Sequence, residues 1–425
     1  MLVNNTSSII NMFEPALVQH IVEHDRNNAL LTKDAEIFIS TEDMFRAFHQ
    51  ANKAFVPVYY PHNQQNFEFL SQFNNIGLKI TPSLNPFFNF NASNINVLYI
   101  SGNGNNSSLP LSTDNPFSAL EKINISGVHV DNDIESIILK QNQNIIKSIR
   151  FEYSKFVSRD LINILNTLIE LKTISALGYN IDKYKINNYL HNSKINSLNI
   201  DFCRFNELTK LSDLLDGNEI QNLSTKSTKN IDVNFDFIVH KLTNLSVVNQ
   251  TIRVSSNVDL NNVKLLDISC CKIDDISLSL ILKSLADIEH VGLSYLNIKD
   301  ELSSYIENYS YLKSITLQGN DKSCIISTEG DIFRNLEVLQ LDDMSLSDSD
   351  VERILGNLDL NSVTHLTLDD NLLTEKSIDR IFNCNNLKSL KFISTRNNTH
   401  LNISYFDCKP LLNPRQVFMG YFHYI

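Results

Sequence analysis

The sequence lacks the features that mark membrane proteins and nucleic-acid-binding proteins. Its 425 residues contain no run of 18 apolar residues, so no transmembrane helix is predicted. The opening segment, MLVNNTSSIINMFEP, has neither the basic nor the apolar region of a signal peptide. No run of four or more lysines and arginines occurs, and the formal net charge is −12, whereas phosphate binding needs clustered positive charge. The sequence therefore predicts no membrane partner and no nucleic-acid partner.

Cysteine is scarce and tryptophan is absent. No C-x-x-C pair occurs among the six cysteines, which are Cys203, Cys270, Cys271, Cys324, Cys384 and Cys408. This spacing favours packed thiols over a metal or disulfide framework, and it predicts a cytoplasmic or nuclear protein. The 55 asparagines make N-x-S/T sequons frequent by chance, so these sequons do not predict glycosylation.

Motifs for catalysis are missing as well. No P-loop, H-E-x-x-H or G-x-S-x-G is present, and the 11 histidines lie without ligand spacing. We therefore predict that the protein is not an enzyme, with no catalytic residue, no metal site and no cofactor.

The chain does contain an internal repeat with the pattern L-x-x-L-x-L-x-x-N/C-x-L, whose positions we number 1 to 11. Position 1 falls at Ile95, Leu120, Ile146, Leu171, Ile195, Ile220, Leu242, Val263, Ile288, Leu312, Leu336, Val363 and Leu387. The first and last of these starts are 292 residues apart over twelve steps, a mean of about 24. This is the period of a leucine-rich repeat.

The clearest unit spans residues 363–373, with Asn371 at position 9. Cys271 and Cys203 occupy position 9 in two other units. Apolar residues at positions 4 and 6 predict a strand with one buried face. The residue at position 9 is expected to bond the backbone groups that become free as the strand ends. The unit at Ile220 is the weakest, because threonine fills its positions 6 and 9, and we expect it to be distorted or out of register.

Between the predicted strands, apolar residues recur at helical spacing after a serine or threonine that can cap a helix. Such stretches are Ser158–Leu168, Ser277–Leu285, Ser347–Leu355 and Thr374–Phe382. The predicted fold is therefore an α/β leucine-rich-repeat solenoid. We expect a horseshoe with a parallel concave sheet and convex helices, similar to the ribonuclease-inhibitor type.

Residues 1–60 do not follow the repeat and contain two amphipathic helical stretches, 13–23 and 40–55. This segment resembles an F-box, with a longer middle than the family has. The matching apolar positions are Phe13, Pro15, Leu17, Ile21, Val22, Met44, Phe48 and Phe55. The resemblance implies that these residues bind a Skp-family adaptor and link the protein to a cullin-type ubiquitin ligase. The alternative is a helical cap that closes the end of the solenoid.

The predicted concave face carries the remaining candidate residues. Asp342 and Asp343 lie one unit before Asp369 and Asp370, and neighbouring strands are about 5 Å apart. Four crowded carboxylates favour a cation or a basic protein partner. Aromatic, basic and histidine side chains that fit a protein interface lie at Arg150, Tyr153, Phe202, His290, Tyr295 and His365.

The leading hypothesis is a protein-binding adaptor, the substrate receptor of an F-box ubiquitin ligase. The alternatives are a regulator such as a leucine-rich GTPase-activating protein or ribonuclease inhibitor, a scaffold, or a microbial effector. The predicted parts are an F-box-like segment (1–60), a linker or degenerate first repeat (61–94), the repeats (95–410) and a C-terminal cap (411–425).

Overall fold

The computed structural model describes most of residues 93–398 and a few short pieces outside them. The described ranges are 38–39, 42, 46, 58–59, 69–70, 72–73, 76–80, 93–102, 117–130, 144–153, 155–156, 165–191, 193–235, 241–254, 258–302, 309–326, 333–398 and 418–419. The chain forms two compact units, Met1–Ser197 and Leu198–Ile425. Strand β11 (Ser197–Asn199) spans their boundary.

The first unit contains a parallel sheet in which each strand pairs with the next one along the chain. Its strands are β1 (Phe38–Ile39), β2 (Val58–Tyr59), β3 (Ile76–Ile80), β4 (Ile95–Ser101), β5 (Lys122–Ser126), β7 (Ser148–Glu152) and β9 (Thr173–Leu177). The other elements are β6 (His129–Val130), β8 (Lys155–Phe156), β10 (Asn180–Ile181) and α6 (Lys183–His191). Parallel pairing thus begins before residue 95. The segment predicted as a linker or degenerate first repeat contains β3.

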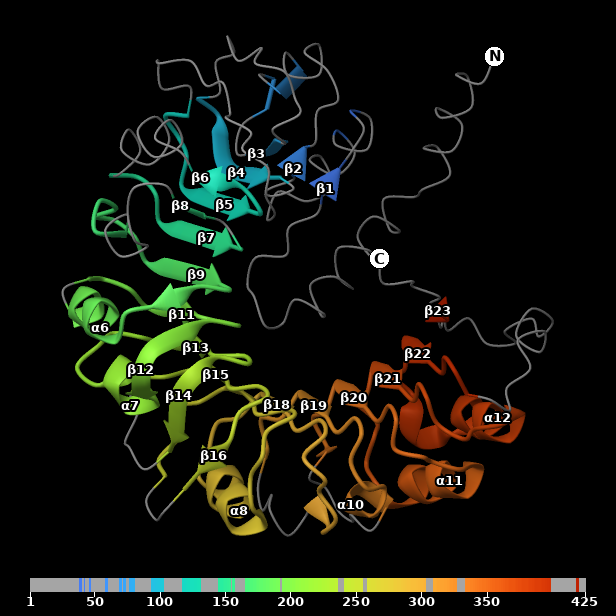
Figure 1. Cartoon of the computed structure of the whole chain (residues 1–425). Coiled ribbons are helices and arrows are strands. Elements are labelled where there is room, and N and C mark those ends of the chain that lie inside the picture. Colours follow the sequence, from blue (N-terminus) through green and yellow to red (C-terminus); the bar gives the residue numbers. More distant parts are fainter. Residues whose placement is uncertain are drawn as a thin grey trace. The chain divides into compact units, whose positions relative to one another are not determined.

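The second unit continues the same pattern with shorter strands (Figure 1). They are β13 (Asn222–Ser224), β15 (Asn244–Ser246), β17 (Leu265–Asp267), β18 (His290–Gly292), β19 (Ser314–Thr316), β20 (Val338–Gln340), β21 (His365–Thr367), β22 (Phe392–Ser394) and β23 (Phe418–Met419). All neighbouring pairs are parallel and in register. In β18 to β21 the middle residue, at position 4, is buried, and the residues at positions 3 and 5 are half-buried. We call the surface formed by positions 3 and 5 the open sheet face.

Helices of the second unit lie along the other side of this sheet (Figure 1). They are α7 (Leu211–Leu215), α8 (Asp275–Lys283), α10 (Ser323–Ile326), α11 (Asp348–Asn357), α12 (Glu375–Asn383) and the 3-10 helix η3 (Asn385–Leu387). The predicted helices at Ser277–Leu285, Ser347–Leu355 and Thr374–Phe382 are confirmed as α8, α11 and α12. The stretch Ser158–Leu168 lies mostly outside the described residues.

Part of the helix side consists of strands, which differs from the expected ribonuclease-inhibitor type. Strands β12 (Arg204–Lys210), β14 (Lys229–Asn234) and β16 (Ile252–Arg253) form a second set of parallel pairs. The register of β13, β15 and β17 gives steps of 22 and 21 residues here, against 24 to 27 from β17 to β22. A strand covers about twice the length per residue that a helix does, so a short repeat crosses this side in extended form.

Two expectations about register need correction. The unit at Ile220 is in register, because Asn222 pairs with Asn244, and the Thr228 hydroxyl donates to the Ile200 carbonyl oxygen at 2.6 Å. A threonine therefore performs the task of position 9 in this unit.

The last unit starts at Leu390 and not at Leu387. Phe392 pairs with His365, which aligns Leu390 with Val363. Both leucines are buried, and each begins an L-x-x-L or L-x-x-I pattern, so apolar spacing alone does not distinguish them.

Candidate functional site

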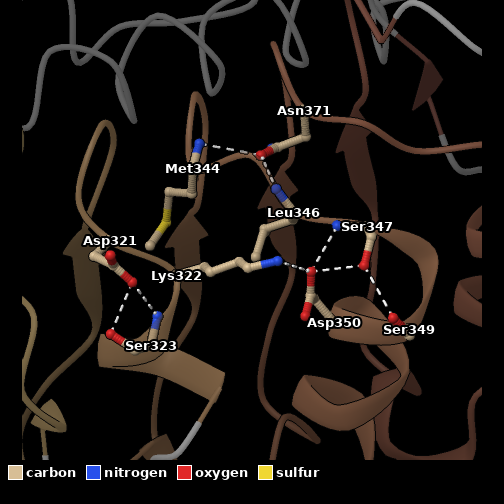
Figure 2. A network of polar contacts seen from close by, with 9 residues as sticks. All are labelled: Asp321, Lys322, Ser323, Met344, Leu346, Ser347, Ser349, Asp350 and Asn371. Atoms are coloured by element: carbon tan, nitrogen blue, oxygen red, sulfur yellow. Dashed lines mark hydrogen bonds and ion pairs between the residues drawn. The ribbon is translucent and has the colours of Figure 1, made fainter.

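Several units end their strand with a buried polar or thiol side chain at position 9, as expected, whereas Val128, Leu296 and Met344 occupy this position in other units. The side-chain oxygen of Asn371 accepts from the amides of Met344 and Leu346, at 3.1 and 2.9 Å (Figure 2). Its amide nitrogen donates to the carbonyl oxygens of Leu341 and Asp369, at 2.9 and 3.1 Å. The predicted role of this position is therefore confirmed, and the bonds reach the preceding unit as well as its own.

Other residues fill position 9 in the same way. Asn320 accepts from two amides of the unit before it and donates to Leu293, at 2.7 Å. The Cys271 thiol donates to the Val247 carbonyl oxygen at 3.0 Å, and burial raises its pKa to about 12. The cysteine at this position is therefore a neutral packed thiol, as its place in the repeat predicted. All cysteines that the structure describes are free.

Position 8 has a left-handed backbone in most units. Its φ is positive at Tyr153, Gly178, Phe202, Ser227, Asn249, Cys270, Tyr295, Gly319, Asp343, Asp370 and Asn397, and at Gly127. The amide of this residue donates to a carbonyl of the next unit, as in Tyr295 to Gln318 at 2.8 Å and Asp343 to Asp369 at 2.9 Å. The turn that follows each strand therefore forms a second line of bonds between units, and its side chains project beside the open sheet face.

Two tyrosines at position 8 lie against a glycine at position 8 of the next unit. A Cβ atom on Gly319 would lie 2.2 Å from the ring of Tyr295, and one on Gly178 would lie 2.5 Å from the ring of Tyr153. Both glycines have positive φ, +68° and +78°. Each ring therefore rests on backbone that only glycine leaves clear, yet 45% of Tyr295 and 63% of Tyr153 stays exposed.

The Tyr295 ring is also held at its hydroxyl. That hydroxyl donates to the Asp343 carboxylate at 3.2 Å and accepts from the Gln318 side chain at 2.9 Å. Burial, together with the negative charge of Asp343, raises the pKa of Tyr295. The tyrosine thus spans three consecutive units.

Aspartates at position 7 connect neighbouring units. Asp342 accepts from the Thr367 hydroxyl at 3.0 Å and from the Asp369 amide at 2.8 Å. Asp369 repeats this arrangement with Ser394 at 2.7 Å and with the Arg396 amide at 2.6 Å. Burial raises the pKa of Asp342 to about 6, and the charges of Asp369 and Asp370 act in the same direction. The predicted crowding of carboxylates is present, but Asp342, Asp343 and Asp369, three of the four, are bonded within the solenoid.

The other candidate residues of the predicted concave face lie in an ion pair, at position 3 of the open sheet face, or at position 8. Arg150 forms an ion pair with Glu152 on β7. His290 and His365 lie at position 3 of the open sheet face, where burial lowers the pKa of His290. The His365 ring lies 5.7 Å from the ring of Phe392. Phe202 is exposed at position 8 of its own unit.

The structure joins Tyr295 to Asp343 by a hydrogen bond, and it places Asp342 near Asp369 and Asp370. Sequence reasoning missed Gly319, Gln318 and Thr367, the residues that hold this group in place. The signal for Gly319 was a glycine at position 8 directly after a unit with tyrosine at that position.

On the helix side, polar bonds connect the helix starts (Figure 2). Ser347 and Asp350 form a capping box at the start of α11, and the Lys322 ammonium lies 2.8 Å from the Asp350 carboxylate. Lys322 immediately precedes α10, so this ion pair joins two consecutive helices. Asp348 accepts from the Thr374 hydroxyl at 2.6 Å and so connects α11 to α12. These groups stabilise the stack of units.

The F-box-like residues Phe13, Pro15, Leu17, Ile21, Val22, Met44, Phe48 and Phe55 lie outside the residues that the structure describes, and so does the predicted cap at 411–425 apart from β23. Within the predicted second helix, Glu42 and Arg46 have helical backbone.

Within the described ranges, no group of three or more histidine, cysteine or acidic side chains is placed to hold a metal ion. No helix in those ranges is both long and apolar enough to cross a lipid bilayer. A pocket of about 490 Å³ lies at the starts of β19 to β21, beside Tyr311, Lys313 and Glu337. Its lysine is already paired with Glu289 at 2.6 Å.

These features define a leucine-rich-repeat solenoid: a parallel sheet built one strand per unit, in which buried side chains at position 9 bond the backbone at the ends of several strands. No protein-family model matches the chain, and no curated protein matches it. Among solved structures, it resembles a chain of the mouse RP105/MD-1 complex, with 13% identity and a TM-score of 0.46. That match covers 90% of this chain and 69% of the other.

A second similar structure is the leucine-rich-repeat ectodomain of the Arabidopsis thaliana membrane receptor kinase GASSHO1/SCHENGEN3, in complex with CASPARIAN STRIP INTEGRITY FACTOR 2. The identity is 14% and the TM-score 0.34, and the match covers 79% of this chain but only 40% of that one. The fold assignment therefore rests on the repeat geometry of this chain itself.

Proposed function

We propose that the protein binds another protein through the open sheet face of its second unit and the position-8 side chains beside it. The observation that carries this proposal is the division of the sheet into two sides. The helices that the structure describes in this unit lie on one side, whereas positions 3 and 5 of β18 to β21 stay half-exposed on the other. A continuous face of this kind, without a catalytic cluster, suits binding rather than chemistry.

Small and polar side chains dominate the middle of this face, with Gly292, Thr316, Gln340 and Thr367 at position 5. Exposed aromatic and charged residues at position 8 border it. A flat polar centre beside fixed aromatic side chains is typical of protein interfaces, in which a few anchors supply most of the binding energy. We therefore propose a binding protein without catalytic activity of its own.

This proposal is tested by comparing the two sides of the sheet. Ser314→Arg combined with Val338→Arg places two bulky charges on the open sheet face at position 3. Ile276→Arg places one on α8, where the side chain is 75% exposed. Proteins captured by the intact chain from cells that express it should be lost with the first variant and retained with the second. Loss only with Ile276→Arg would contradict the proposal.

A narrower role, as the substrate receptor of a cullin-type ubiquitin ligase, is proposed from the sequence alone. It is supported by the F-box-like residues Phe13, Pro15, Leu17 and Ile21 and by the repeats that follow them. In this role the N-terminal segment binds a Skp-family adaptor, and the open sheet face holds the substrate. A cytoplasmic or nuclear location is part of the same proposal, because the described cysteines are free and two of them fill position 9.

The test is a pull-down that probes for the Skp-family adaptor and a cullin. The intact chain should recover both, and Leu17→Asp combined with Ile21→Asp should recover neither. Asp287→Asn, an exposed change before β18, serves as the control that leaves recovery unchanged. If neither the intact chain nor the control recovers the adaptor, the ligase role is wrong, and the binding role of the sheet is unaffected.

A further inference from the structure

We propose that Tyr295 and Asp343 form a docking site for a basic segment of the partner protein, with an arginine or lysine side chain over the exposed part of the tyrosine ring. This inference rests on the proposed function, because it names the chemistry of a partner on that face.

The first observation is the rigidity of the ring. Tyr295 rests on Gly319, and its hydroxyl is bonded to both Asp343 and Gln318. An exposed tyrosine on a surface normally samples several rotamers and loses that freedom on binding. Here the ring is already fixed by three contacts while 45% of the side chain remains exposed. A pre-organised aromatic ring of this kind binds with a smaller entropy cost.

The second observation is the charge around the ring. Within the described part of the chain, no lysine or arginine forms an ion pair with Asp342, Asp343, Asp369 or Asp370. Several glutamates elsewhere are paired with lysines, as in Glu121 with Lys147 at 2.5 Å and Glu289 with two lysines. The charge beside Tyr295 is therefore left for a cation from outside the chain.

The other tyrosine–glycine pair shows why this site differs. Tyr153 rests on Gly178 in the same way, but its neighbour Glu152 is paired with Arg150. An aromatic ring attracts a cation through its negative face, and a nearby unpaired carboxylate adds to this attraction. Tyr295 offers both contributions, whereas Tyr153 offers only the ring. The chain thus supplies its own matched control.

The experiment measures binding of a fluorescent eight-arginine peptide to the full chain by anisotropy, with an eight-citrulline peptide as the uncharged comparison. We expect the arginine peptide to bind and the citrulline peptide to bind far more weakly. Tyr295→Leu and Asp343→Asn should each weaken binding of the arginine peptide about threefold to tenfold. Tyr295→Phe keeps the ring on Gly319 but loses both hydroxyl bonds, so its binding should lie between that of the unaltered chain and that of Tyr295→Leu. Tyr153→Leu should leave binding unchanged.

Three results would overturn the proposal: no binding of the arginine peptide to the intact chain, unchanged binding by both Tyr295→Leu and Asp343→Asn, or equal weakening by Tyr153→Leu. Circular dichroism of each variant identifies a change that acts by unfolding, and Asp343→Asn keeps the test valid if Tyr295→Leu does not fold. If these results appear while Ser314→Arg with Val338→Arg still abolishes partner capture, the open sheet face remains the binding surface, and only the choice of a basic partner is wrong.

Discussion

The ring of Tyr295 occupies the space that a side chain on Gly319 would need, since a Cβ there would lie 2.2 Å from the ring. Residues 24 positions apart in the sequence thereby meet because they share position 8 of consecutive units. The glycine serves two purposes, a φ of +68° and room for the ring. The same relationship between Tyr153 and Gly178 shows that it is a recurring feature of this solenoid.

Gly319→Ala should therefore lower the free energy of unfolding by about 1–2 kcal/mol, because a left-handed backbone strains alanine. The displaced ring should lose its bond to Asp343. Gly356→Ala is the matched control, since no atom lies within 4 Å of the added methyl group. This change in α11 should stabilise the protein by up to about 1 kcal/mol. Urea denaturation of both variants measures the difference, and equal effects would contradict the account.

Asn371→Ala should cost about 2–4 kcal/mol, because two buried amides and two carbonyl groups lose their partner. Asn371→Asp retains the two acceptor contacts to Met344 and Leu346 but loses the donor contacts, so its cost should be of the same order through burial of a charge. An exposed change such as Asn361→Ala, before β21, is the control. A loss below about 0.5 kcal/mol for Asn371→Ala would show that position 9 does not close the strand.

The Asp342 carboxyl group should make the free energy of unfolding depend on pH. Its folded-state pKa of about 6 lies above the ordinary value of 3.8, so the folded state binds more protons between these two pH values. This contribution therefore rises as pH falls from about 6 to about 4, by an amount on the order of 2 kcal/mol. Asp342→Asn removes it. The free energy of unfolding of the unaltered chain should therefore rise relative to that of the variant as pH falls through this window, and a constant difference would contradict the raised pKa.

Most other shifted carboxyl groups act in the opposite direction. Hydrogen bonds to Ser277 lower the pKa of Asp274, and bonds to Lys313 and Lys264 lower that of Glu289. Their stabilisation is present above the unfolded-state pKa and is lost as pH falls through the lowered folded-state pKa. Asp274 and Glu289 are present in both the unaltered chain and Asp342→Asn. Their pH dependence therefore cancels in the difference between the two proteins, which leaves the contribution of Asp342.

Asp350→Ala should destabilise the protein by about 1–2 kcal/mol, because it removes the capping box with Ser347 and the ion pair with Lys322. Lys322→Ala removes only the ion pair and should cost less than about 1 kcal/mol. Thermal unfolding compares the two variants. If Lys322→Ala proves as costly as Asp350→Ala, the link between α10 and α11 is more important than the helix cap.

The sequence was sufficient to predict the register of most strands and the task of position 9, because alternation and period are local signals. Val363 to Leu373 shows this, since every apolar position and Asn371 lie where the pattern placed them. It did not predict strands β12, β14 and β16, which lie on the helix side between Arg204 and Arg253. Whether a strand or a helix forms on this side depends on the number of residues between consecutive strands of the sheet. The sequence gives that number only once the register of the strands is known.

The candidate site was predicted less completely. Tyr295, Asp342 and Asp369 were identified by type and position, and the crowding of carboxylates is present. The contacts that decide their roles come from neighbouring units: Gly319 under the ring, and Thr367 and Ser394 on the two carboxylates. A single unit does not contain this information, because it arises only when the units stack.

The most direct test of the central claim is site-specific photo-cross-linking with one reactive side chain at a time. Positions 316 and 340 lie on the open sheet face, and positions 276 and 382 are exposed on α8 and α12. In the presence of the captured partner, we predict cross-links from positions 316 and 340 and none from positions 276 and 382. Cross-links from the two helices alone would show that the partner binds the opposite side and would contradict the account.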